Sequence, residues 1–221
     1  MKFVLLVAEK VMELIWLWLR QRRRYAKVFF SLAPKIHLMR FILLLLLLPF
    51  ITPAFSQSGK SVGMYLGIPF VNEKLKEGRE YKPFQLLLYY NFTNLLNDRK
   101  NDLWVYLEPQ FVWVHFSPKD KNEVEFGANL GLEYRLNISA QTAFIAAIGS
   151  GPHYISVETK QQAKGYIFSD NFTAGIRHRP GGSGIGLDLK FRYRHISNAG
   201  IKNPNKGIDS WFVIFGATKD L

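Results

Sequence analysis

From residue 57 to the end, the chain repeats one pattern, a long strand-like run that ends in a short polar turn. No segment in this part approaches the ~20 consecutive apolar residues that a transmembrane helix needs. Each run is long enough for a tilted strand to cross a bilayer, for which ~9–11 residues suffice. Pro109 lies inside the third run and predicts a bulge or a rim there. We predict eight strands, near residues 61–71, 82–93, 102–116, 122–136, 140–157, 164–179, 183–197 and 209–219.

The seventh run alternates cleanly between apolar and polar side chains. A soluble sandwich would bury the apolar face, whereas an outer-membrane barrel turns it toward lipid and keeps the charges in the lumen. The long runs, their even number, the aromatic content of 15% and a preceding export signal favour the barrel. The predicted fold is therefore all-β, an eight-stranded antiparallel outer-membrane β-barrel. The alternating faces are Ile185, Leu187, Leu189, Phe191 and Tyr193 on one side, and Gly186, Asp188, Lys190, Arg192 and Arg194 on the other.

The export signal is an apolar run over residues 41–51, which follows Arg40 and precedes the small-residue site Ala54-Phe55-Ser56. This pattern predicts a secretory signal peptide over residues 39–56, cleaved before Gln57. Residues 1–38 are then either an extension upstream of the real start, which we favour, or a basic amphipathic anchor. The barrel domain is expected to span residues 57–221.

The net charge of +12 does not indicate a nucleic-acid partner, because much of it lies in the first 56 residues. Of 29 basic and 17 acidic residues, nine and two lie there, which leaves 20 and 15 and a net charge of +5. That balance is ordinary for a protein domain. The chain has no cysteine, which excludes a disulfide scaffold.

A candidate catalytic group lies at the end of the seventh run. Residues two apart in a strand share a face, so His195 and Ser197 continue the apolar row. His195 could take the Ser197 proton, and Asp209 is the next carboxylate after it along the chain and could orient the imidazole. Asn198 and Asn205 could donate hydrogen bonds to an oxyanion. Spacing alone leaves two interpretations open, catalysis or a polar pair at the edge of a barrel.

Residues 195–209, HISNAGIKNPNKGID, carry a more specific pattern. This stretch resembles the signature of the outer-membrane lipid A 3-O-deacylases (PagL-like), which runs His-x-Ser-Asn, then a Pro-Asn-x-Gly turn, then an acid. The resemblance implies that Ser197 is the nucleophile, His195 the base and Asp209 the group that orients the base. It also implies that Asn198 and Asn205 bind the oxyanion. The acid is typically Glu in the family, so Asp209 is one methylene shorter.

The resemblance implies a serine esterase of the bacterial outer membrane that hydrolyses the 3-O acyl ester of lipid A. It would release a fatty acid and remodel lipopolysaccharide, its partner in the membrane. No cofactor is implied, and His115, His153 and His178 lack partners at metal-ligand spacing, so no metal site is expected. Two alternatives are a non-catalytic structural or adhesive barrel and a phospholipase-type barrel. A homodimer is compatible with the sequence.

Overall fold

The computed structural model of the chain describes residues 59–72, 75, 80–96, 100–117, 121–181 and 184–221. The predicted extension over residues 1–38 and the signal peptide over residues 39–56 lie outside these residues and stay predictions. Among the described residues, no helix has the length and apolar character needed to cross a membrane.

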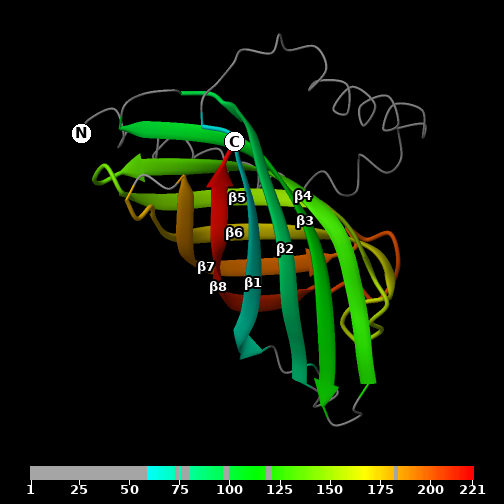
Figure 1. Ribbon diagram of the computed structural model, residues 1–221. Helices are drawn as coiled ribbons and strands as arrows, with labels where there is room; N and C mark the ends of the chain where they lie inside the picture. The colour runs from blue at the N-terminus through cyan, green and yellow to red at the C-terminus, as the bar shows by residue number, and fades with distance from the viewer. Residues whose placement is uncertain (1–58, 73–74, 76–79, 97–99, 118–120, 182–183) are drawn as a thin grey trace, which may run out of the picture. The chain divides into compact units, whose positions relative to one another are not determined.

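In the described residues, eight antiparallel strands form one closed barrel, in which β8 returns to pair with β1 (Figure 1). Each strand pairs with its neighbours along the chain, so the topology is a simple meander. The prediction of an all-β, eight-stranded antiparallel barrel is confirmed, and every predicted run matches one strand to within two residues. The strands are β1 (Ser61–Asn72), β2 (Glu80–Asn94), β3 (Asn101–Ser117), β4 (Lys121–Asn137), β5 (Thr142–Ile155), β6 (Gly165–His178), β7 (Ile185–Ser197) and β8 (Ile208–Asp220).

Strand β3 passes through Pro109 without a change of register. Pro109 pairs with Ala128 of β4 in an unbroken ladder, and the register shift between β2 and β3 lies at Asn91 and Thr93. The predicted bulge or rim at Pro109 is therefore wrong. The missing N–H of proline removes one donor, and between Leu107 and Gln110 the pairing of β3 with β2 skips Glu108 and Pro109.

The faces of β7 are arranged as in a membrane barrel. Its apolar residues point outward and are exposed, from Ile185 to Phe191, whereas Asp188, Arg192 and Arg194 point into the lumen and are buried. The same inversion holds around the barrel, where large exposed hydrophobic side chains alternate with buried polar ones. This is the reverse of a soluble protein and the arrangement that lipid requires.

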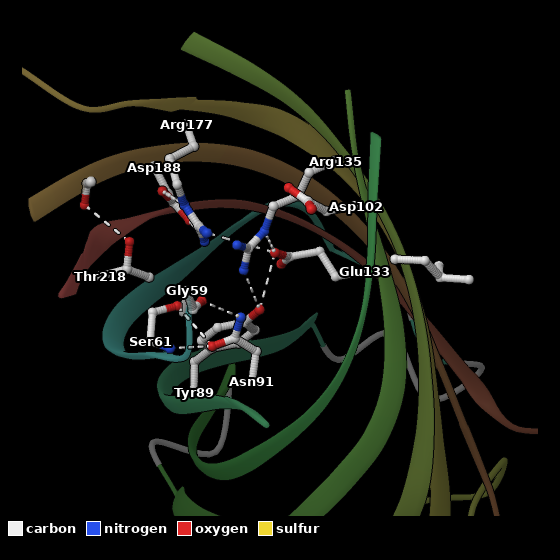
Figure 2. Close-up of polar contacts among 12 residues, drawn as sticks. Gly59, Ser61, Tyr89, Asn91, Asp102, Glu133, Arg135, Arg177, Asp188 and Thr218 are labelled. Atoms are coloured by element: carbon white, nitrogen blue, oxygen red, sulfur yellow. Dashed lines mark hydrogen bonds and ion pairs between the residues drawn. The ribbon is translucent and has the colours of Figure 1, made fainter. Parts of the chain in front are cut away.

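The buried charges neutralise one another inside the lumen. Glu133 lies 2.6 Å from Arg135 and 3.7 Å from both Arg177 and Lys190, while Asp188 lies 2.7 Å from Arg177 and 3.0 Å from Lys190. Figure 2 shows Arg135, Arg177, Asp188 and Glu133 projecting into the same part of the barrel. Charges buried in this way are tolerated only when paired and hydrogen-bonded. The network therefore braces the wall that carries β7.

Apolar and aromatic side chains fill the rest of the lumen in two buried clusters. One buried cluster consists of Leu75, Tyr81, Val112, Val114, Ile155, Val157, Ile167, Ile196 and Ile208. A second consists of Tyr65, Leu87, Tyr89, Tyr106, Ala147, Phe212 and Ile214. An eight-stranded barrel is just narrow enough for side chains to fill it in this way.

Two long connections leave the barrel at one end, here called the long-loop end. They are residues 156–164, between β5 and β6, and residues 198–207, between β7 and β8. Backbone hydrogen bonds join them, from Ala163 N to Pro204 O at 2.8 Å and from Lys206 N to Gln161 O at 2.7 Å. Gln162 and Asn205 form a bridge between these bonds. The loop that follows Ser197 is thus held by a second loop.

Candidate active site

The hairpin of β7 and β8 places His195 directly opposite Asp209 on the outward face of the barrel. His195 Nδ1 lies 2.6 Å from Asp209 Oδ1, and the two side chains are 27% and 52% exposed. A carboxylate accepts hydrogen bonds, so this contact requires a hydrogen on Nδ1. In the neutral imidazole, Nε2 then carries the lone pair that a general base uses.

Tyr193 adds a second hydrogen bond to the same carboxylate oxygen. Its hydroxyl donates to Asp209 Oδ1 at 2.8 Å. The Tyr193 ring is held between Trp211, at a centroid distance of 5.1 Å, and Phe172, at 6.2 Å. From the sequence, Tyr193 was only one member of the apolar row. The structure makes it part of the polar group around His195.

Ser197 is the last residue of β7, and its pairing partner on β6 is the outward-facing Phe168. This register places Ser197 on the same face as His195, although only 7% of the serine is exposed. Among the described residues, Ser197 Oγ forms no hydrogen bond with the His195 ring, whose Nδ1 contacts Asp209. The three predicted residues are therefore neighbours, but only the histidine and the aspartate are in contact.

Gly207 lies against the free edge of the His195 ring. A Cβ atom at this position would come within 2.4 Å of His195 Cε1 and 2.8 Å of His195 Nε2. The backbone of Gly207 also has a φ of +78°, a conformation that favours glycine. Only a residue without a side chain allows the loop to approach the imidazole this closely.

The two predicted oxyanion residues organise the loop that follows the serine. Asn198 N donates to Asn205 Oδ1 at 2.7 Å, which links the two ends of the turn. The side chain of Asn198 donates to Lys202 O at 2.6 Å and accepts from Gly200 N at 3.0 Å. Within the described residues, Asn205 Nδ2 forms no hydrogen bond, so its donors face no protein acceptor.

A second carboxylate flanks His195 from the other side. On β6, Asp170 pairs with His195, and on β5, Ser150 pairs with Asp170. Ser150 Oγ donates to Asp170 Oδ1 at 2.6 Å. A polar row therefore crosses four strands in the order Ser150, Asp170, His195, Asp209. Neither Ser150 nor Asp170 was a candidate from the sequence, since no local spacing relates them to residues 195–209.

No group of three or more His, Cys, Asp or Glu side chains in the described ranges is arranged to hold a metal ion.

An apolar outward face, a filled and charge-balanced lumen and a meander of eight strands together define an integral outer-membrane β-barrel. Within that class, the chain belongs to the lipid A 3-O-deacylase (PagL) family, whose sequence profile matches residues 84–218. The matched range contains the whole of the polar row. The predicted family and the predicted location in the outer membrane are thereby confirmed.

Two crystal structures share this fold. That of the outer membrane enzyme PagL is 17% identical, with a TM-score of 0.54, and the match covers 71% of this chain and 97% of that one. That of Neisserial surface protein A (NspA) is 12% identical, with a TM-score of 0.52, and the match covers 74% of this chain and 98% of that one. No curated protein matches the chain. At these identities, the likeness to the two structures concerns the fold alone.

Proposed function

We propose that this protein is a serine esterase that hydrolyses the 3-O-linked acyl chain of lipid A. The observation that carries the proposal is the 2.6 Å contact between His195 Nδ1 and Asp209 Oδ1 on the lipid-facing side, beside Ser197. A buried ion pair would need no special explanation, but an oriented imidazole that faces lipid does. Membership of the deacylase family supports an ester of lipid A as the substrate.

In the proposed first half-reaction, His195 Nε2 accepts the proton of Ser197 Oγ as the oxygen attacks the ester carbonyl. The resulting imidazolium gives this proton to the departing sugar oxygen as the C–O bond breaks. In the second half-reaction, His195 takes a proton from water, which attacks the acyl-serine and releases the fatty acid. The proton then returns to Ser197 Oγ. Asp209 holds the ring in the required tautomer throughout.

The step requires a rotation of the Ser197 side chain toward Nε2. Catalytic hydrogen bonds are often long before substrate binds and shorten in the complex. A side chain at Gly207 would obstruct Nε2, since its Cβ would lie 2.8 Å from that atom.

We assign the oxyanion to the loop after the serine. The Nδ2 group of Asn205 supplies donors, and Asn198 fixes Asn205 through its own backbone N–H. The second amide hydrogen of Asn198 Nδ2 can also reach substrate, since Lys202 O takes only one. Donors fixed before the reaction stabilise the tetrahedral intermediate without having to reorganise.

The location of the site suits a lipid of the outer leaflet. Outer-membrane barrels have short periplasmic turns and longer external loops, so the long-loop end, where the site lies, is assigned to the cell exterior. Loop 198–207 carries the exposed Lys202 and Lys206 and no acidic residue, which favours an anionic headgroup. A substrate that resides in the membrane can reach the outward-facing His195 laterally.

The substitution Ser197→Ala tests the proposal. Purified protein is incubated with lipid A and, separately, with a glycerophospholipid, and the products are identified and quantified by mass spectrometry. The wild type is expected to release fatty acid from lipid A, and Ser197→Ala to slow this at least about 1,000-fold, because the nucleophile is lost. Ser139→Ala, in the turn between β4 and β5, is the control and should keep full activity.

Other results would contradict the proposal. Release from the glycerophospholipid alone would indicate a phospholipase, and release from neither lipid would indicate a non-catalytic barrel. Retained activity in Ser197→Ala would exclude this serine as the nucleophile. A heat-dependent shift in gel mobility shows that each variant has formed the barrel.

A further inference from the structure

We propose that Asp170, held by Ser150, forms a second substrate subsite on the lipid-facing surface, where it accepts a hydrogen bond from a hydroxyl or amide N–H of the bound lipid. This inference rests on the proposed esterase function. It concerns recognition of the lipid beside the scissile ester, and it involves neither the nucleophile nor the base.

The position of Asp170 is unusual for its surroundings. In β5 to β8, which the structure describes in full, the outward-facing carboxylates are Asp170 and Asp209, and both flank His195. Charged groups on the lipid face destabilise a barrel in a way that depends on depth. The residues that precede and follow Asp170 on the same face of β6 are Phe168 and Phe172. A carboxylate that faces outward between two phenylalanine side chains calls for a functional explanation.

Ser150 fixes the orientation of this carboxylate. Its hydroxyl donates to Asp170 Oδ1 at 2.6 Å across the β5–β6 ladder. A carboxylate has about four lone-pair sites, so this hydrogen bond leaves it able to accept others. Because an ionised carboxylate can only accept, the group that it recognises has to be a donor, such as a hydroxyl or an amide N–H of the lipid.

The chemistry of His195 argues that Asp170 serves the substrate. Asp209 already holds Nδ1, and Nε2 has to remain an acceptor for the Ser197 proton. A second acceptor therefore cannot improve the orientation of a neutral imidazole.

The register brings Asp170 within reach of a bound ester. Phe168 pairs with Ser197 and Asp170 pairs with His195, so Asp170 is the diagonal neighbour of the serine. Diagonal neighbours in an antiparallel pair lie about 7–8 Å apart. When Ser197 Oγ attacks the carbonyl, a donor only a few bonds from that carbonyl can span the remaining distance. Asp170 would thus select esters that carry a hydroxyl or amide next to the reacting bond.

The test is a double-mutant cycle between enzyme and lipid. Three lipids are compared: lipid A, lipid A with the hydroxyl groups methylated, and lipid A with the amide nitrogens methylated. The enzymes are the wild type, Asp170→Asn, Asp170→Leu and Ser150→Ala. The measured quantities are kcat and KM for fatty acid release, together with the pH profile.

For the wild type, kcat/KM is expected to be at least about tenfold lower on one of the methylated lipids than on lipid A. A loss of this size corresponds to one hydrogen bond to a charged group. Asp170→Leu should lose the same factor on lipid A and nothing further on that methylated lipid. Ser150→Ala should lose a smaller factor in kcat/KM on lipid A, and it should also lose nothing further on that methylated lipid. The matched control is the pair Thr142 and His178, which lie 3.0 Å apart on the same two strands at the opposite end. Thr142→Val and His178→Gln should leave all three rates unchanged.

Two results would overturn the subsite. An equal loss on all three lipids, or a shifted pH profile in Asp170→Asn, would mean that Asp170 acts on His195 and recognises no donor. Unchanged rates in Asp170→Leu would mean that it has no part in the reaction. If the wild type releases no acid from lipid A, the proposed function itself fails, and this result is distinct from both. Gel mobility confirms that each variant has formed the barrel.

Discussion

The side chain of Asp209 is one methylene shorter than the glutamate typical of the family, yet its Oδ1 lies 2.6 Å from His195 Nδ1. The pairing of β7 with β8 explains this reach, because the two residues are directly opposite one another. Directly opposed residues have Cβ atoms only about 4.5–5.5 Å apart. Tyr193 holds the same oxygen from a diagonal position and limits the rotation of the short carboxylate.

Replacement of Tyr193 by phenylalanine tests this second hydrogen bond. Tyr193→Phe keeps the ring contacts with Trp211 and Phe172 and removes only the donor. Because Asp209 is half exposed, we expect a modest decrease in kcat, about 3- to 10-fold, with little change in KM. Steady-state rates on lipid A measure both constants. Tyr154→Phe, on the outward face of β5, is the matched control, and a rise in KM at constant kcat would contradict the positioning role.

At the scale of elements, the site depends on a loop that another loop holds in place. Loop 198–207 supplies Asn205 and Gly207 to the site, and its backbone pairs with loop 156–164 at Pro204 and Lys206. Asn205 has two separate tasks in the proposed function. Its Oδ1 fixes the turn through Asn198 N, and its Nδ2 faces the oxyanion.

Two substitutions separate these tasks. Asn205→Asp keeps an acceptor for Asn198 N but has no amide donor, so the loop should stay ordered while kcat falls about 100-fold or more. Asn205→Ala loses both groups, so kcat should fall similarly and trypsin should cut faster after Lys202. Limited proteolysis combined with rate measurements distinguishes the two variants. Equal protease sensitivity in both would show that Oδ1 does not hold the turn.

The strand positions could be predicted because the sequence signals for them are local to each strand and turn. Alternation along β7, polar turns such as residues 97–101 and the absence of long apolar runs are local properties, and they located all eight strands to within two residues. The contact between His195 and Asp209 was also foreseeable, since the two strands form a hairpin.

The other members of the polar row were not foreseeable. Asp170 meets His195 only through the register of β6 on β7, and Ser150 meets Asp170 through that of β5 on β6. A slip of one residue in either ladder would turn these side chains to the other face. Nothing in the sequence near Asp170 specifies that register. Tyr193 was missed for a different reason, because its aromatic ring fits the lipid-facing row and its hydroxyl shows no pattern.

At the scale of the whole molecule, the charges inside the barrel balance one another. Glu133 is approached by Arg135 and Arg177, and Tyr89 donates to it at 3.0 Å (Figure 2). Lys190 lies 3.7 Å from the same carboxylate. No water surrounds a buried charge to compensate it when a partner is removed. Breaking one of these pairs is therefore expected to lower the free energy of unfolding by more than the intact pair contributes to it.

Glu133→Gln is expected to destabilise the barrel by about 3–5 kcal/mol, because three buried cations lose their shared anion. Urea unfolding in lipid vesicles, followed by tryptophan fluorescence, measures the change in the free energy of unfolding. Glu158→Gln is the control, since its 3.6 Å pair with Lys164 is exposed and should contribute almost nothing. Similar effects of the two substitutions would show that the lumen network does not set the stability.

The outward orientation of His195 at the long-loop end has a consequence for how the two reactants meet. The ester would arrive by diffusion within the plane of the leaflet, so its encounter rate depends on its mole fraction among the lipids and not on its bulk concentration. Water, the other reactant, has to come from the headgroup layer above. The proposed hydrolysis would thus take place at a phase boundary, with one reactant supplied from each side.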